Sequence, residues 1–229
     1  MEEALLELAG SKSWRMTADV AGLPHIALYI RDALGLGPLE SADPPRLEGD
    51  VPDRSALIAP DDRVRASATW HTWWAQIISS QTSQLPRQAP PHATSVWLQD
   101  AHQPAAPANS PSAADADSAP GLIAVIRELE EEARAWLDLH RRRWRPPPPE
   151  VRRQQTLLSR SAAEAAARLS TTPTGELSAD TILLLVRGDW SLQPSPGVLM
   201  HAPSLFSTPD LMERRLRDTF ASSAASTAS

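Results

Sequence analysis

The chain has 229 residues, of which 41 % are hydrophobic, and its 22 basic and 28 acidic side chains give a formal net charge of −6. This length supports one domain of ordinary size or two small ones. The chain has no cysteine, which excludes disulfides, thiolate metal sites and cysteine nucleophiles. The first residues lack the basic start of a secretory signal, and no run approaches the roughly 18 apolar residues of a membrane span. We therefore expect a cytoplasmic protein that does not contact membranes.

Residues 1–99 form a predicted helical N-terminal region. Apolar residues recur with helical spacing over 16–35, with a break near Gly22, and again over 61–81. The second of these segments starts at a pair of aspartates, a residue type that caps helix N-termini. We therefore expect helices in both segments.

A DNA-binding helix-turn-helix is one interpretation of residues 14–36. Gly22 follows a small residue by four positions, as the turn of that motif requires. His25 and Arg31 would then be the candidate DNA-contacting residues. The first 100 residues, however, carry 8 basic and 13 acidic side chains, and their net charge of −5 repels phosphate. Nucleic acid is thus a disfavoured partner, and two ordinary helices joined by a Gly-Leu-Pro turn are the favoured interpretation.

Three tryptophans and a histidine stand together in residues 68–78, ATWHTWWAQII. On a helix the tryptophans share one broad face with two isoleucines, which favours burial in the core or in an interface between copies of the chain. His71 falls at the margin of that face. The alternative interpretation is a ligand pocket walled by Trp70, His71 and Trp74.

Residues 100–120 are rich in proline, alanine and serine and show no hydrophobic periodicity. This composition predicts a disordered linker. It would separate the N-terminal region from a C-terminal region over 121–221. Residues 222–229, which begin SSAAS, are predicted to be a disordered tail.

Two helices are predicted at the start of the C-terminal region, over 120–144 and 150–169. The first has a continuous apolar stripe opposite a ladder of alternating charges. Four consecutive prolines, at 146–149, end it and start the second. We expect the two helices to pack on each other as an antiparallel hairpin.

The end of the first helix and the start of the second are rich in arginine. The stretch HRRRWRPPPPEVRR, residues 140–153, has six arginines and one glutamate. Such a cluster attracts anionic partners. The candidate partner-binding residues are Arg141, Arg142, Arg143, Arg145, Arg152 and Arg153. The alternative is a solvated pair of helix ends.

The last part of the C-terminal region changes from helical to strand periodicity. TILLLVR at 181–187 is a short continuous apolar run, typical of a buried strand. Turn residues separate it from two further short apolar segments, WSLQ and VLMHA. Pro209 is suited to the first position of a final helix. The predicted fold class is therefore α+β and mainly α-helical, with a helical hairpin, a small antiparallel sheet and a helical N-terminal part.

No motif in the chain indicates catalysis or a cofactor. The six histidines are isolated from one another, and nucleophile elbows, phosphate-binding loops and dinucleotide fingerprints are not found. No resemblance to a known family is apparent. The favoured hypothesis is an intracellular, non-catalytic protein-interaction module that binds another protein or a second copy of itself. The alternatives are a DNA-binding regulator that uses 14–36, and an enzyme or small-molecule binder with a tryptophan-lined pocket.

Overall fold

The computed structural model describes residues 14–20, 22–37, 43–84, 120–143, 149–169 and 177–227. Its strands are β1 (Trp14–Asp19), β2 (Leu177–Leu183), β3 (Ser191–Ser195) and β4 (Val198–His201). Its α-helices are α1 (Gly22–Ala33), α2 (Arg63–Gln84), α3 (Pro120–Arg143), α4 (Pro149–Leu169) and α5 (Pro209–Thr227). Short 3₁₀ helices are η1 (Ser55–Leu57), η2 (Pro60–Asp62) and η3 (Pro203–Ser207). These elements confirm the mainly α-helical α+β fold class.

The four described strands form one mixed sheet in the order β1-β2-β4-β3. β1 pairs parallel to β2, and β2 pairs parallel to β4. Only β3 runs antiparallel, next to β4. Each of the three short apolar segments of the C-terminal region overlaps a strand. The first is shifted, because β2 is Leu177–Leu183 and not 181–187, and the sheet is mixed rather than antiparallel.

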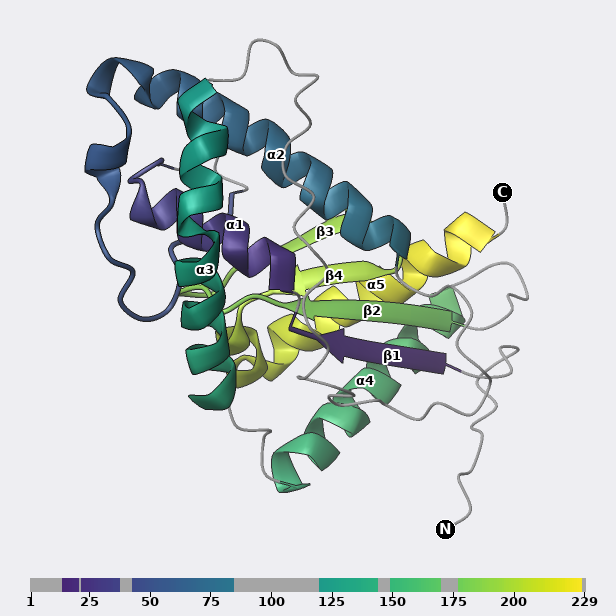
Figure 1. The fold of residues 1–229 in the computed structure, drawn as a ribbon. Coiled ribbons are helices and arrows are strands. Elements are labelled where there is room, and N and C mark those ends of the chain that lie inside the picture. Colours follow the sequence, from purple (N-terminus) through teal and green to yellow (C-terminus); the bar gives the residue numbers. More distant parts are fainter. Residues whose placement is uncertain are drawn as a thin grey trace.

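Helices cover both faces of the sheet, so that the protein has three layers (Figure 1). One face carries α1, α2 and α3, which we call the tryptophan layer. The other carries α4 and α5, which we call the alanine layer. Each layer has its own hydrophobic cluster. Because side chains alternate across a strand, neighbouring residues of β4 serve different clusters: Met200 faces the tryptophan layer and Leu199 the alanine layer.

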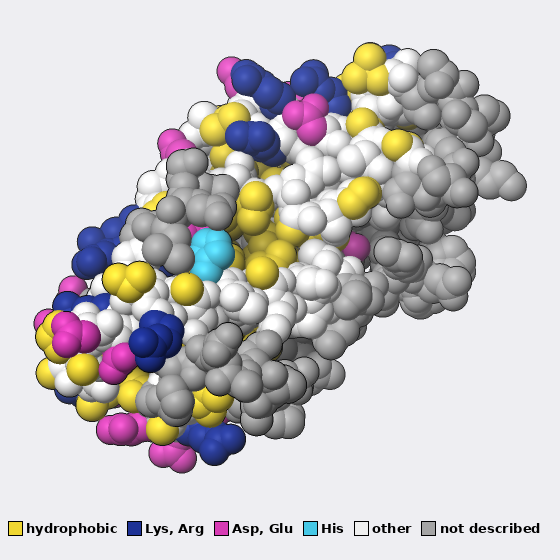
Figure 2. Space-filling view, turned by 90° about the horizontal axis from the view of Figure 1, so that it is seen from above, with side chains coloured by type: hydrophobic (Ala, Val, Ile, Leu, Met, Phe, Trp, Pro, Cys, Tyr) yellow, Lys and Arg dark blue, Asp and Glu magenta, His cyan; other side chains and the backbone are white. Residues whose placement is uncertain are grey.

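The tryptophan layer is built around α1, most of which is buried. α2 places its tryptophan face against it, and Trp70, Trp73 and Trp74 are each at most 5 % exposed. The indole nitrogen of Trp70 donates a hydrogen bond to the carbonyl of Ala27, at 2.8 Å. The interpretation of this face as core is thus confirmed. The outward residues of α2 after Arg65 are uncharged, and Figure 2 shows charged side chains gathered mainly toward the edges of this side of the molecule.

In the alanine layer small side chains bring α4 close to its neighbours. Its buried residues include Ala162, Ala163 and Ala166. α5 contributes larger apolar groups to the same cluster, among them Leu216 and Phe220. At the C-terminal end of α4, Leu169 is 68 % exposed, so the buried face of the helix ends before it.

The first predicted helix of 16–35 is wrong over its N-terminal part, because residues 14–19 are strand β1. β1 is ordered by parallel pairing with β2, in which Trp14 lies opposite Leu177. Local periodicity carries no information on a partner so distant in the sequence. The helix that follows, α1, is present as expected.

The predicted helical hairpin is also wrong, although both of its helices form. α3 belongs to the hydrophobic cluster of the tryptophan layer and α4 to that of the alanine layer. Figure 1 shows the two helices on different sides of the sheet. The proline-rich connection therefore carries the chain from one layer to the other.

The regions 1–99 and 121–221 meet in one structure, because β1 comes from the first and β2 from the second. α1 of the first region and α3 of the second likewise contribute to one core. Of the predicted linker 100–120, only Pro120 lies within the described residues, at the start of α3. The tail predicted from 222 is instead helical as far as Thr227, and Ser223 and Ala224 are buried in it.

Candidate functional site

A pocket opens between α4, α5, β1 and η3, and we call it the α4–α5 pocket. The space inside it that is wide enough for a water molecule is about 80 Å³, which is smaller than the roughly 300–1,000 Å³ of usual small-ligand sites. The lining residues are Met16, Gln154, Gln155, Leu158, Ser159, Phe206, Pro209, Met212 and Leu216. None of them is charged, and most are apolar.

Helical spacing places these side chains together. Pro209, Met212 and Leu216 lie at positions i, i+3 and i+7 of α5, which form one face of a helix. On α4 the lining residues are two adjacent pairs four positions apart. The pocket therefore lies along the N-terminal halves of both helices, before the alanines of α4 begin.

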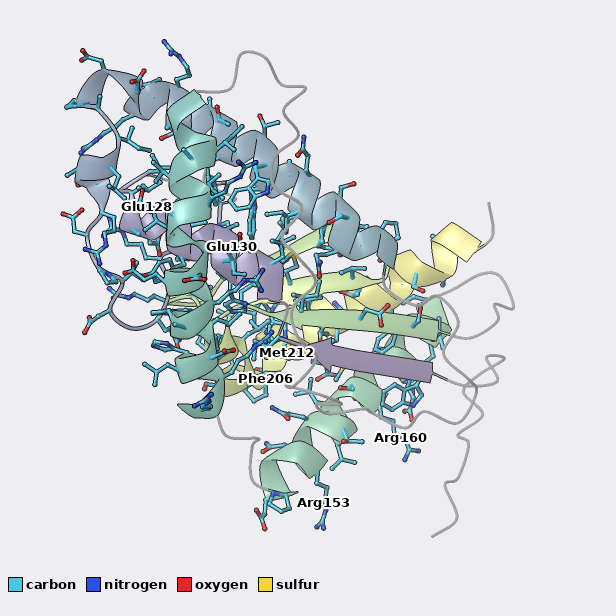
Figure 3. All side chains as sticks on the ribbon, viewed as in Figure 1. Glu128, Glu130, Arg153, Arg160, Phe206 and Met212 are labelled. Carbon is cyan, nitrogen blue, oxygen red and sulfur yellow. The ribbon has the colours of Figure 1, made fainter. Side chains whose placement is uncertain are left out.

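Sulfur and aromatic groups make up much of the apolar wall. Figure 3 shows Phe206, from η3, and Met212, from α5, close together beyond the end of β1. Met16 comes from β1 itself. Behind the wall, the ring of Phe206 makes a T-shaped contact with His201, with 5.0 Å between ring centroids. The pocket thus presents polarizable groups of the kind that pack well against aromatic rings.

The polar end of the pocket is formed by Gln155 and Ser159. The side-chain oxygen of Gln155, Oε1, is buried and has no hydrogen-bond partner. The hydroxyl of Ser159 is directed to the Gln155 carbonyl, at 2.8 Å, and to Met16 Sδ, at 3.2 Å. Gln155 Oε1 exposes less than 1 Å² of surface, so a ligand in the open space of the pocket does not reach this oxygen.

Next to the pocket, His201 is held in its neutral form. Complete burial lowers the pKa of His201 to about 4, although a hydrogen bond to the Ala202 carbonyl, 2.9 Å away, acts in the opposite direction. The ring is therefore neutral at physiological pH. It supports Phe206 and does not contribute charge to the pocket.

The rim of the pocket is partly polar and partly apolar. Arg153 directly precedes the lining residue Gln154 and is exposed, and Figure 3 shows it near the start of α4. Leu157 follows Gln154 by three positions and is 59 % exposed, so the two share one surface of the helix. On the α5 side, Glu213 accepts a hydrogen bond from Ser161, at 2.6 Å. The accessible surface therefore extends beyond the pocket along α4.

The two tryptophans of the predicted tryptophan-lined pocket, Trp70 and Trp74, are buried in the core. Trp70 and Trp74 stack on each other, with 5.6 Å between ring centroids, inside the tryptophan layer. The Nδ1 atom of His71 lies 3.6 Å from a carboxylate oxygen of Asp43. These three residues hold α2 and the preceding loop to the core.

The two candidate DNA-contacting residues are buried, so this prediction is wrong for the described structure. His25 is 0 % exposed and accepts a hydrogen bond from the Leu185 backbone N–H. Arg31 is 1 % exposed; it pairs with Asp32 at 2.8 Å and donates hydrogen bonds to the carbonyls of Pro44 and Pro45. A recognition helix must present such side chains to solvent. Here His25 binds the segment after β2, and Arg31 binds the loop at Pro44 and Pro45.

The predicted arginine cluster is only partly within the described residues. Arg141 donates a hydrogen bond to the Val20 carbonyl, just after β1, so it joins α3 to the sheet. Arg142 and Arg153 are exposed. Arg145 lies outside the described residues, and the side chains of Arg143 and Arg152 are not described. Of the three candidates whose side chains are described, Arg153 is the one next to the pocket.

A hydrogen-bonded cluster on the tryptophan layer involves Tyr29. Its hydroxyl donates to Glu132 Oε1 at 2.8 Å, and Arg54 Nη2 lies 3.3 Å from the same oxygen. Burial, together with that carboxylate, raises the pKa of Tyr29 well above its usual value. The cluster joins α1 to α3 and to the loop before η1. Within the described part of the chain, no group of three or more His, Asp or Glu residues is placed to hold a metal ion.

None of the described helices combines the length and the apolar character that a membrane span requires.

Sequence reasoning missed the α4–α5 pocket. Its lining comes from four segments between Met16 and Leu216, and no single segment carries a recognisable motif. One local signal was present. Gln154, Gln155 and Ser159 are polar, and they lie on the same sides of α4 as the alanines that are buried further along the helix. Polar residues on an otherwise buried side of a helix mark a position where the packing against neighbouring elements changes.

Comparison of the chain with protein-family models, with curated proteins and with solved structures finds no match.

Proposed function

We propose that the protein is a protein-interaction module that binds its partner through the α4–α5 pocket. The observation that carries this proposal is the pocket itself, an uncharged and mostly apolar hollow at the surface that is lined by residues of α4, α5, β1 and η3. Concave, mostly apolar surfaces with a few polar groups are the usual sites of specific binding. The partner inserts one apolar side chain into the pocket.

The surroundings of the pocket support a partner larger than a free small molecule. Leu157 and Arg153 are exposed next to the mouth of the pocket. A small ligand enclosed by the pocket would leave both side chains in water. Protein interfaces often combine a buried apolar anchor with arginine and apolar contacts around it. This arrangement joins the pocket to the arginine-rich segment that the sequence singled out.

Methionine methyl groups allow a direct test. The chain has four methionines: Met16 and Met212 line the pocket, whereas Met200 is buried against the tryptophan layer. The protein is labelled with ¹³C in its methionine methyls and titrated with blocked tripeptides, acetyl-Gly-X-Gly-amide, in which X is Val, Leu or Met. We expect saturable NMR shifts of Met16 and Met212, with Met200 unchanged.

Two tryptophan substitutions at adjacent positions of α4 provide the control. Leu158→Trp places a large ring at a lining position and should abolish the shifts, whereas Leu157→Trp, outside the pocket, should preserve them. The proposal is wrong if no peptide shifts Met16 and Met212, or if both variants behave alike. Binding of free indole without binding of any peptide would also overturn it, because the site would then be one for small molecules.

A further inference from the structure

We infer that the outer edge of β1, the side away from β2, pairs with the outer edge of β1 in a second copy of the chain. The two sheets then join into one across a twofold axis at Thr17. Figure 1 shows β1 at one edge of the sheet and β3 on the far side of β4. Within the described part of the chain, β1 pairs with β2 alone.

The outer edge of β1 is suited to accept another strand. A strand at the edge of a sheet presents backbone N–H and C=O groups that a further strand binds. β1 contains no proline, so each of its residues keeps a backbone donor. The ring of Trp14 makes a T-shaped contact with Phe220, with 6.1 Å between centroids, and the carbonyl of Val20 accepts a hydrogen bond from Arg141. The strand is therefore held at both ends before a second copy arrives.

The opposite edge of the sheet is protected. β3 contains Pro194, which has no backbone N–H to donate. Its register with β4 also shifts between Leu192 and Ser195, and such irregularities keep edge strands from pairing. When two copies join through β1, a β3 strand lies at each end of the combined sheet. Association therefore stops at two copies.

The sequence of β1 is complementary to itself. Arg15 and Asp19 stand two positions before and two positions after Thr17. When two copies pair antiparallel about Thr17, Arg15 of each copy stands opposite Asp19 of the other, and Met16 stands opposite Ala18. Residues of opposite charge directly across an antiparallel pair stabilise it, whereas like charges destabilise it. The twofold axis creates both Arg15–Asp19 pairs at once, so the charges of this edge favour a second copy.

Sedimentation velocity of the full chain measures this association. We expect a species of twice the 24.9 kDa of one chain as the concentration rises. Arg15→Asp brings like charges together at both pairs, and Asp19→Arg does the same with the opposite sign. Because two pairs change from attraction to repulsion, the dissociation constant should rise about tenfold or more in either variant. Far-UV circular dichroism like that of the native protein shows that each variant is folded.

The double variant Arg15→Asp/Asp19→Arg is the matched control, because it restores opposite charges across the two strands. It should associate about as tightly as the native protein. An equimolar mixture of the two single variants should form a heterodimer, since each supplies the charges that the other lacks.

Three results would overturn the inference. One is a native chain that stays monomeric up to about 300 µM, a weak limit for specific association. Another is a dimer that the single variants leave unchanged, because the copies would then meet at another surface. The third is a dimer that the single variants weaken and that neither the double variant nor the mixture restores.

Discussion

The two sides of the sheet are filled in different ways. The tryptophan layer uses large aromatic groups on α2 and α3, such as Trp70, Trp73 and Trp136. The alanine layer brings α4 close to its neighbours with small groups such as Ala162 and Ala166. Aromatic side chains fill space when helices stand apart, whereas alanines require the helices to approach closely.

This difference explains the position of the pocket. The alanines of α4 begin at Ala162, and the pocket is lined by residues before it, up to Ser159. Toward the N-terminus of α4, larger side chains stand in place of the alanines, and they do not fill the space between α4 and α5. A layer built on close approach therefore leaves room for a ligand where its packing pattern changes.

The largest expected effect is the loss of a tryptophan from the first layer. Trp70→Ala removes a buried ring, its hydrogen bond to Ala27, and its contact with Arg31, whose guanidinium carbon lies 5.5 Å from the ring centroid. We expect the free energy of unfolding to fall by about 3–5 kcal/mol, as measured by urea denaturation. The exposed Thr72→Ala on the same helix should change it by about 0.5 kcal/mol or less. A cost near that of the control would show that the layer does not depend on its aromatic groups.

A second prediction concerns His201, which lies where the layers meet, because its neighbour Phe206 packs against both clusters. Its pKa falls from 6.5 to about 4 on burial, so the unfolded chain binds the proton first. The contribution of His201 is therefore complete above pH 6.5 and is lost as the pH falls toward 4, by up to about 3 kcal/mol.

Urea denaturation of the native protein and of His201→Gln at several pH values measures this contribution. Carboxylates titrate in both proteins and cancel in the difference. The stability advantage of the native protein should shrink steadily between pH 6.5 and 4.5. A difference that does not vary with pH would contradict the neutral, buried imidazole.

The smallest of the three effects tests close packing in the alanine layer. Ala166, 1 % exposed, should not tolerate a larger group, and Ala166→Leu should destabilise the protein by about 1–3 kcal/mol. The same change at the adjacent, half-buried Ala165 should cost less, because its side chain can turn toward solvent. Melting temperatures of the two variants provide the comparison. Equal values would mean that α4 is not held as closely as described.

Elements with a strong local pattern could be predicted from the sequence, and elements defined by distant partners could not. The apolar stripe of α3 and the tryptophan face of α2 predicted both helices and their buried sides. β1 was taken for helix because its order comes from pairing with β2. The packing of α3 and α4 on opposite faces was missed for the same reason, since a short connection favours neighbours but does not determine them.

The candidate site was less predictable than the fold. Residues that attract attention in a sequence, such as Trp70 and Arg31, are buried and structural. Gln155 and Met212 are unremarkable in the sequence. They line the same pocket only because the fold brings two helices and a strand together. A pocket made by packing has no sequence motif, because its shape depends on what the surrounding side chains leave empty.

The position of β1 also has a consequence for how the protein is made. Trp14 pairs with Leu177, a residue synthesised 163 positions later. β1 thus leaves the ribosome long before its partner strand exists, and it cannot enter the sheet until most of the chain has been made. Pairings over such a separation slow folding and leave strand edges exposed in the meantime. Folding of the nascent chain should therefore depend on synthesis reaching β2.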